Sequence, residues 1–401
     1  MSALEQAALM LAGRLADDAV PGPRGPAWSG DRFDLQTGDQ LVRGPVDDGL
    51  LTGRAGVALA LAAAGSLPGA DPRLTSLAVT TMRHLTDDRA PVRGADWMSG
   101  DLGVARAAWA VAGLTGADDL RASAARTAAR CVSALARGVD VPPQADLIDG
   151  RAGALMAVLA ASLPDSAERD RRAAAELLVR ALRTDAERDA WGTRWPMEVH
   201  WPPVAGLAHG AAGVALALRA ARACGFDDDG LADDAAVWED GWYDAARGGW
   251  PDLRDGTGDG PAVAWCHGAL GIGIAAAVRS RLGDDGEVTF RRAARGASAL
   301  PAVVDGVDGT LCHGRTGVVE LHLTAARTWP RDGTHLRAAR AAARPLADGT
   351  HPDGTTWLHG LRGGRTPDLL TGTAGVVVSL VRCVDPLRVP ETTHPGLRVD
   401  G

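Results

Sequence analysis

The sequence contains no lysine, few aromatic residues and no long apolar run, and each shortage narrows the possible functions. Aromatic residues make up 4% of the 401 residues, whereas Ala and Leu supply most of the 46% that are hydrophobic. This composition favours closely packed helices over sheets. Arginine is the basic residue, and it is interspersed with acidic residues along a chain whose net charge is −8. That distribution excludes the basic surface that is typical of nucleic-acid-binding proteins.

No segment resembles a secretory signal or a membrane span. The N-terminal stretch carries Glu5 and lacks the basic start of a signal. Gly, Arg and Asp interrupt each apolar run before the roughly 20 residues that a bilayer requires. We therefore expect a cytoplasmic protein. Its five cysteines are odd in number and widely spaced, which argues for reduced thiols and against a disulfide framework.

One motif recurs seven times: an apolar residue, a polar residue and then Gly-x-x-Gly, followed by an apolar helical segment. The copies are LTGRAG (51–56), MSGDLG (98–103), IDGRAG (148–153), AHGAAG (208–213), CHGALG (266–271), CHGRTG (312–317) and LTGTAG (370–375). Charged helical sequence separates the copies. The pattern predicts an all-α fold, an α/α toroid of seven helical hairpins with about fourteen helices, in which the motifs begin the inner helices.

We expect one toroid domain over residues 1–385, because helical repeats of this kind commonly fold as one unit. The tail over residues 386–401, rich in Pro, Thr and Arg, is predicted to be extended or mobile. The acidic segment FDDDGLADDAAVWEDG (226–241) is predicted to be a solvent-exposed loop between repeats. The polar residue before each first glycine suits a helix-entry or capping position, and Asp149 is predicted to be a cap.

Cysteine and histidine gather in one sector of the predicted ring. If the repeats are equivalent, Cys266 and Cys312 lie at the same height on neighbouring inner elements, and His209 and His313 flank them. Two thiolates and one imidazole are ligands that zinc prefers, and three protein ligands leave a fourth position open for water or substrate. We assign Cys266, Cys312 and His313 as zinc ligands.

The other motif copies and the other cysteines need only packing roles. Gly suits a sharp turn and close backbone approach at the start of an inner helix, so a helical solenoid explains most copies of the motif. Cys131, Cys224 and Cys383 lie at no matching repeat position. We predict core or helix-face positions for these three thiols.

Three segments, GLAHGAAG, AWCHGALGIGIA and LCHGRTGVVELHL, resemble the signature segments of the LanC-like family, the lanthipeptide cyclases. The resemblance covers nearly the whole chain. It implies an α/α toroid in which Cys266, Cys312 and His313 hold Zn²⁺ and His209 acts as an acid or base. The segment DLIDG resembles a family segment whose leading aspartate lines the active site, which implies that role for Asp146.

Two positions depart from the nisin-type stand-alone cyclases. In those proteins Tyr usually follows the first zinc cysteine and Arg stands four residues before it, whereas here these positions hold His267 and Ala262. The WCHG form is more similar to the cyclase half of bifunctional lanthipeptide synthetases. His267 is therefore a candidate for assisting proton transfer, for a metal role or for lining the cavity.

The resemblance implies formation of lanthionine rings. A peptide cysteine sulfur adds to dehydroalanine or dehydrobutyrine, and the resulting enolate takes a proton at its α-carbon. The expected partners are a dehydrated precursor peptide and a separate dehydratase, because no dehydratase module precedes the toroid.

Other functions stay open at this stage. One is a noncatalytic LanC-like subunit that binds the peptide or scaffolds a maturation complex. Another is a zinc hydrolase or glycosidase on a similar toroid, although a glycosidase needs two carboxylates facing one cleft. Addition of a free small thiol to dehydrated residues is a variant of the cyclase chemistry that the sequence does not distinguish.

Overall fold

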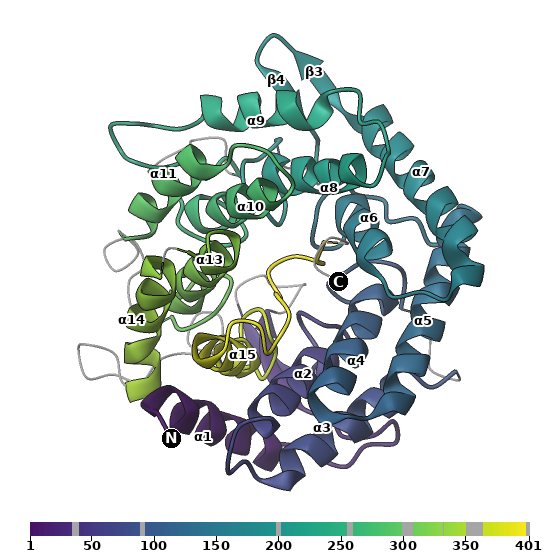
Figure 1. The fold of residues 1–401 in the computed structure, drawn as a ribbon, viewed down its shortest axis with the longest axis vertical. Coiled ribbons are helices and arrows are strands. Elements are labelled where there is room, and N and C mark those ends of the chain that lie inside the picture. The colour runs from purple at the N-terminus through teal and green to yellow at the C-terminus, as the bar shows by residue number, and fades with distance from the viewer. Residues whose placement is uncertain are drawn as a thin grey trace.

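Within the described part of the chain, fourteen α-helices form two concentric rings (Figure 1). The computed structural model describes residues 1–33, 40–88, 93–197, 202–254, 260–298, 308–331, 333–349 and 364–397. The inner helices are α2 (Arg54–Gly65), α4 (Asp101–Thr115), α6 (Arg151–Ala160), α8 (Ala211–Ala223), α10 (Ala269–Arg281), α13 (Arg315–Thr328) and α15 (Thr373–Val384). The outer helices are α1 (Ala3–Asp17), α3 (Pro72–Leu85), α5 (Asp118–Ala136), α7 (Glu168–Asp185), α9 (Leu231–Gly241), α11 (Glu287–Ala297) and α14 (Thr334–Asp348). The predicted all-α toroid is confirmed.

Each inner helix packs against the outer helix that follows it, except at one seam of the ring. There α15 packs against α1, which comes from the opposite end of the chain (Figure 1). Neighbouring inner helices also contact one another, including α2 with α4 and α15 with α2. The seventh hairpin is therefore made by two helices that are far apart in sequence.

The two rings differ in the way that their helices are buried. Residues 54–64 of inner helix α2 are all buried, which is typical of a helix that is surrounded by protein. Small alanine side chains allow the inner helices to approach closely. Outer helix α14 buries only Ala339, Ala343 and Leu346 among its described side chains, so it presents one stripe to the core. None of the helices in the described residues is long and apolar enough to cross a membrane.

The first glycine of each motif is the N-cap of an inner helix, and no side chain caps these helices. The preceding polar residue therefore lies at the helix entry and is not the cap, so the capping alternative is wrong. The second glycine is required by close contact. A Cβ atom at Gly153 would lie 1.9 Å from the carbonyl oxygen of Leu147, and one at Gly271 would lie 2.1 Å from that of Trp265. Any larger residue would push the inner helix away from the loop before it.

A closed ring of backbone hydrogen bonds joins the segments that precede the seven motifs. The amide donors and carbonyl acceptors are Leu51 to Met98, Met98 to Ile148, Leu147 to Ala208, Ala208 to Cys266, Trp265 to Cys312, Cys312 to Leu370 and Leu370 to Leu51. This ring holds matched positions of adjacent repeats side by side. It also places the N-terminal ends of the inner helices on one face of the toroid.

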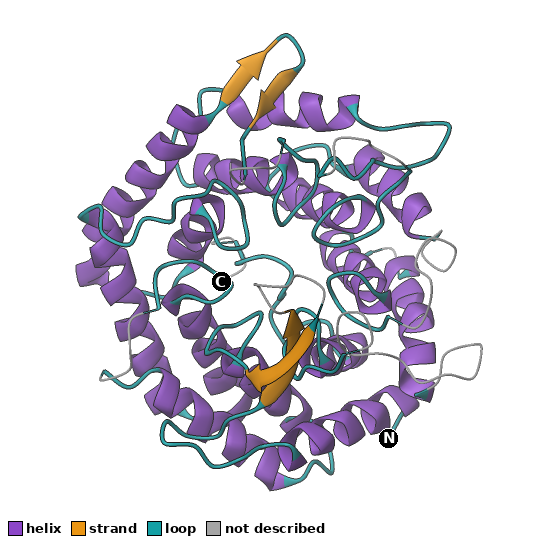
Figure 2. Cartoon of the chain, turned by 180° about the vertical axis from the view of Figure 1, so that it is seen from behind, coloured by secondary structure: helices purple, strands orange, loops and turns teal. Residues whose placement is uncertain are grey.

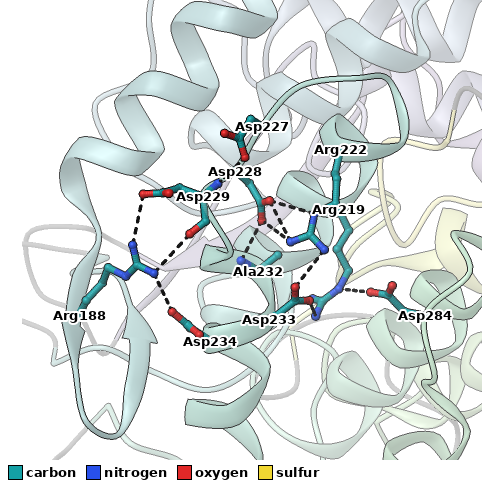
Figure 3. Close-up of polar contacts among 10 residues, drawn as sticks. All are labelled: Arg188, Arg219, Arg222, Asp227, Asp228, Asp229, Ala232, Asp233, Asp234 and Asp284. Carbon is teal, nitrogen blue, oxygen red and sulfur yellow. Dashed lines mark hydrogen bonds and ion pairs between the residues drawn. The ribbon is translucent and has the colours of Figure 1, made fainter.

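The acidic segment that was predicted to be a loop is largely the outer helix α9, so that prediction is wrong. Arginines of the inner helix α8 pair with its carboxylates: Arg222 contacts Asp228 at 2.8 Å and Asp233 at 3.0 Å, and Arg219 contacts Asp233 at 3.1 Å (Figure 3). These ion pairs offset the repulsion between the acidic side chains. The segment can then form a helix that packs on α8.

Two short antiparallel hairpins stand outside the helical rings. Strand β1 (Ser29–Phe33) pairs with β2 (Leu41–Pro45), and β3 (Glu187–Asp189) pairs with β4 (Gly192–Arg194). In Figure 2 the β1–β2 hairpin lies in front of the ring. The amide of Asp31 in β1 donates to the carbonyl of Arg365, just before the seventh motif, so this hairpin lies on the same face as the motif loops.

The tail over residues 386–397 contains no helix or strand and packs at the opposite face (Figure 1). Glu391 is 2% exposed and lies 2.8 Å from Arg281 at the end of α10 and 3.3 Å from His394. His394 is fully buried. The composition suggested an extended or mobile end, but these contacts fix the described tail against the C-terminal ends of inner helices. The domain boundary at residue 385 stays a prediction.

A fully buried ion pair joins inner helices α13 and α15. Arg382 contacts Glu320, and neither side chain has exposed surface. Replacing Glu320 alone with leucine leaves the Arg382 charge buried without its partner, so we expect the free energy of unfolding to fall by about 3 to 5 kcal/mol. Urea denaturation measures this loss. The double variant Glu320→Leu, Arg382→Met should recover most of it, and a double variant as unstable as the single one would contradict the explanation.

Candidate metal centre

The three predicted zinc ligands lie together at the N-terminal ends of α10 and α13. The Sγ atom of Cys266 lies 3.4 Å from Nε2 of His313, and Sγ of Cys312 lies 3.8 Å from the same nitrogen. All three ligand atoms are within 4.8 Å of one another. The amide of Trp265 donates to the carbonyl of Cys312 at 2.7 Å. This bond of the backbone ring brings the two ligand loops together.

The spacing and chemistry of these side chains fit a zinc ion. Tetrahedral zinc with bonds of about 2.3 Å to sulfur and about 2.0 Å to nitrogen holds its ligand atoms roughly 3.6 Å apart. The observed separations of 3.4 and 3.8 Å lie on either side of that value. Cys266 and Cys312 are buried, whereas His313 is partly exposed. The donor set therefore lies at the edge of the core, where a fourth ligand has access.

Cys266 and His313 stabilise each other's charged forms. Hydrogen bonds from Cys312, His267 and His313 hold the pKa of Cys266 well below its ordinary value, although burial opposes this. Burial also lowers the pKa of His313, but the hydrogen bond and charge of Cys266 outweigh it, and the net effect raises that pKa. The pocket thus favours a thiolate at Cys266, which is the protonation state that metal binding needs.

A second group of ionisable side chains comes from the motif loops before α6 and α8. Oδ2 of Asp146 lies 2.7 Å from Nδ1 of His209, and Asp146 is completely buried. Burial alone lowers the pKa of His209, but the hydrogen bond and charge of Asp146 outweigh burial and raise it above its ordinary value. His209 is therefore biased toward its protonated form, with Nδ1 oriented by the carboxylate.

His267 lies between the two groups. Its ring stacks on His209, with centroids 5.5 Å apart and an angle of 24° between the planes, and its side chain hydrogen-bonds to Cys266. His267 is 3% exposed. Among the described residues, the ligand group contains Cys266, Cys312 and His313 and does not include it. The structure therefore brings all six predicted site residues together, and His267 lies at the contact between the thiols and the imidazole of His209.

Asp149 also belongs to this second group, which sequence analysis missed. Each of Asp146, Asp149 and His209 offers a ligand atom within 4.8 Å of the others. The N-cap of α6 is Gly150 and receives no side-chain bond, so the prediction that Asp149 is a cap is wrong. The repeated motif contains a pattern that could have identified Asp149 as a site residue. The residue before the first glycine is ionisable in four successive copies, at Asp149, His209, His267 and His313.

Arg254 is a second residue that the motifs did not reveal. Its pKa is raised first by the hydrogen bond to Asp252, and also by the charges of Cys266 and Cys312. Nε of Arg254 lies 2.9 Å from Oδ1 of Asp252. A guanidinium therefore acts on the two thiols, although position 262 holds alanine. No repeat spacing points to Arg254, because it lies in the irregular segment between α9 and α10.

The remaining three cysteines do not belong to the site. All five cysteines are free of disulfide bonds. Burial raises the pKa of Cys131 to about 12 and that of Cys383 to about 12, so both are protonated near neutral pH. Cys224 is half-buried at the C-terminal end of α8. Their positions agree with packing roles.

Comparison with known proteins assigns the family. The family model described as "Lanthionine synthetase C-like protein" matches residues 44–393. The chain belongs to the lanthionine synthetase C-like family. The LanC-like match includes all seven motifs and both groups of site residues, and it leaves α1 outside.

A solved structure shows the same fold. The structure named "Nisin cyclase" is 16% identical in sequence to this LanC-like chain, with a TM-score of 0.58, and the match covers 85% of this chain and 90% of that one. At this level of identity the likeness establishes the shared toroid fold. No curated protein matches the chain in sequence.

Proposed function

We propose that this LanC-like protein is a zinc-dependent lanthipeptide cyclase that acts in the cytoplasm on dehydrated precursor peptides. The observation that carries the proposal is the contact between two groups with different chemistry. Cys266, Cys312 and His313 form a thiol-activating zinc set, and the pair of Asp146 and His209 lies beside it, with His267 stacked between. Addition of a thiol to a dehydrated residue needs these two kinds of chemistry.

The first group prepares the nucleophile. Cys266, Cys312 and His313 would hold the zinc ion, which would favour the thiolate form of a substrate thiol at neutral pH. The negative charges of the two cysteine ligands keep such a sulfur electron-rich. Arg254 lies close enough to interact with both cysteines, so it offsets part of the negative charge that gathers there.

The second group supplies a proton. A new bond joins the peptide sulfur to the β-carbon of the dehydrated residue, and the electron pair of the double bond moves onto the α-carbon and its carbonyl. His209 is the proposed donor to that α-carbon, because a protonated imidazole held by Asp146 is an effective acid near neutral pH. His209 then takes up a proton equivalent to the one lost by the peptide thiol, so the addition is balanced.

The surrounding structure assists both steps. Helices α8, α10 and α13 begin at the motif loops that carry the site, and their N-terminal dipoles favour the negative charge that develops on the enolate oxygen. His267 is proposed to assist proton transfer by supporting His209 from one side and Cys266 from the other. The site serves the addition alone, so we assign dehydration of the peptide to a separate dehydratase.

A peptide with one dehydroalanine and one free cysteine tests the proposal. Ring closure leaves the mass unchanged but removes the thiol that reacts with an alkylating agent, so mass spectrometry after alkylation measures it. We expect closure to depend on the protein, to stop after chelation and to resume when zinc is returned. A competing small thiol in the same assay distinguishes ring closure from intermolecular addition. Peptide that stays fully alkylatable with zinc-loaded protein would favour the noncatalytic subunit.

A further inference from the structure

The loops before α4, α6 and α15 each form the same kind of turn, so the residues at matching positions in these loops can be compared. In each, an aspartate four residues before the first glycine accepts the backbone N–H of the residue just before that glycine. The donor and acceptor pairs are Ser99 to Asp96 at 2.6 Å, Asp149 to Asp146 at 3.2 Å and Thr371 to Asp368 at 2.7 Å. The side chains at the donor positions therefore occupy equivalent places in the three repeats.

In two of these loops the donor residue also closes the turn with a hydroxyl group. The hydroxyl of Ser99 lies 3.1 Å from Asp96, and that of Thr371 lies 3.1 Å from Asp368. The third loop has Asp149 at this place, and its carboxyl group lies beside that of Asp146, with an oxygen of each within 4.8 Å of the other. A carboxylate has no hydrogen to donate, whereas a protonated carboxyl group has one. A side-chain hydrogen bond between these two neighbouring carboxyl groups, equivalent to those of Ser99 and Thr371, therefore requires a proton on the Asp149–Asp146 pair.

The charges around Asp149 keep that proton in place. Burial first, and then the charge and hydrogen bond of Asp146, raise the pKa of Asp149 to about 7. The negative charge of Asp96, in the loop before α4, also raises the pKa of Asp149. The positive charge of His209, in the loop before α8, lowers it. The nearest arginine in sequence, Arg151, is paired with Asp185. Asp149 therefore changes protonation close to neutral pH.

Asp146 connects Asp149 to the proposed acid. Its Oδ2 binds His209, while its Oδ1 accepts the backbone N–H of Asp149. A proton donated by Asp149 draws negative charge away from Asp146, so Asp146 holds the proton of His209 less strongly. When Asp149 loses its proton, a second negative charge lies beside His209. His209 then holds its own proton more tightly and becomes a weaker acid.

We propose that Asp149 is a positioning residue that donates a hydrogen bond to Asp146 and thereby sets the acidity of His209. This inference rests on the proposed cyclase function for its consequence, which is that ring closure slows as Asp149 loses its proton. The Asp149→Ser variant places in this loop the hydroxyl found at Ser99. The serine hydroxyl keeps a hydrogen-bond donor beside Asp146, but unlike the carboxyl group of Asp149 it does not change protonation near neutral pH.

The test follows the protonation of His209 directly, and so does not depend on cyclase activity. The zinc-loaded protein is labelled with ¹³C-histidine, the His209 signal is assigned by its loss in His209→Asn, and its pKa is measured by NMR. In Asp149→Ser we expect this pKa to fall by about one unit, because the neighbouring negative charge is gone. Asp149→Asn, which keeps the side-chain shape, should give a shift of the same sign.

The control variant Ser99→Ala removes the equivalent donor from the neighbouring loop and should leave the His209 pKa unchanged. In a cyclisation assay against pH, the decline in rate that accompanies ionisation of Asp149 should disappear in Asp149→Ser. An unchanged His209 pKa in both folded Asp149 variants would overturn the inference. A shifted pKa in a protein without cyclase activity would support the coupling and refute the proposed function alone.

Discussion

Replacement of Cys312 with alanine is expected to remove zinc from the purified protein and to abolish ring closure with it. The variant leaves two of the three proposed ligands. Loss of a residue that merely supports a ligand costs roughly 10- to 100-fold in metal affinity, and loss of the ligand itself should cost more. Elemental mass spectrometry on the wild type and the variant, purified in parallel, measures the metal content as zinc per chain.

Cys131→Ala is the matched control for that experiment. Cys131 is also a buried cysteine, but it lies on outer helix α5 and belongs to neither group of site residues. The wild type and this control should each carry about one zinc per chain, as expected for a three-ligand site with one open position. A folded wild-type protein without zinc, or a Cys312→Ala protein that retains it, would contradict the assignment of the metal centre.

Replacement of His209 with asparagine is expected to slow ring closure by about 10²- to 10⁴-fold while zinc stays bound. This is the range that a positioned general acid contributes, and the ligand set does not include His209. Initial rates of thiol loss measure the effect. The stereoisomer ratio of the product gives a second reading, because protonation by solvent is not confined to one face of the enolate.

His84→Asn provides the comparison for His209→Asn. His84 is an exposed histidine on outer helix α3, and its replacement should leave both the rate and the isomer ratio unchanged. A His209→Asn protein that closes rings at the wild-type rate would remove His209 from the mechanism. Together with Cys312→Ala, this variant separates loss of the metal from loss of the proton donor.

The ring and the grouping of Cys266, Cys312 and His313 could be predicted because both depend on repeat spacing. Two cysteines at matched places in consecutive motifs must become neighbours when the repeats are equivalent. The ring of backbone hydrogen bonds, for example from Trp265 to Cys312, is the physical reason for that equivalence. The prediction of Asp146 came instead from family resemblance, and its carboxylate lies 2.7 Å from the ring of His209.

Other features escaped prediction because they depend on contacts between repeats. Asp149 has the local sequence of a helix cap, but its carboxyl group lies within 4.8 Å of Asp146 and of His209, which comes from the next repeat. The acidic segment looked like a loop because Arg219 and Arg222, which neutralise it, lie on the preceding inner helix. Arg254, whose pKa the charges of Cys266 and Cys312 help to raise, lies in an irregular segment that no periodic pattern describes.

The seam between α1 and α15 has a consequence for synthesis of the protein on the ribosome. Helix α1 is synthesised long before α15, yet these two helices form one hairpin, in which Ala8, Leu11 and Leu15 of α1 are buried. Until α15 is synthesised, the nascent chain is an open arc in which α1 can contact α2 and α3 but lacks its hairpin partner α15. Closure is thus a late and long-range folding step, and such steps are slow and prone to misassembly. If α1 instead docks on the α15 of another nascent chain, two rings close at once as a domain-swapped dimer.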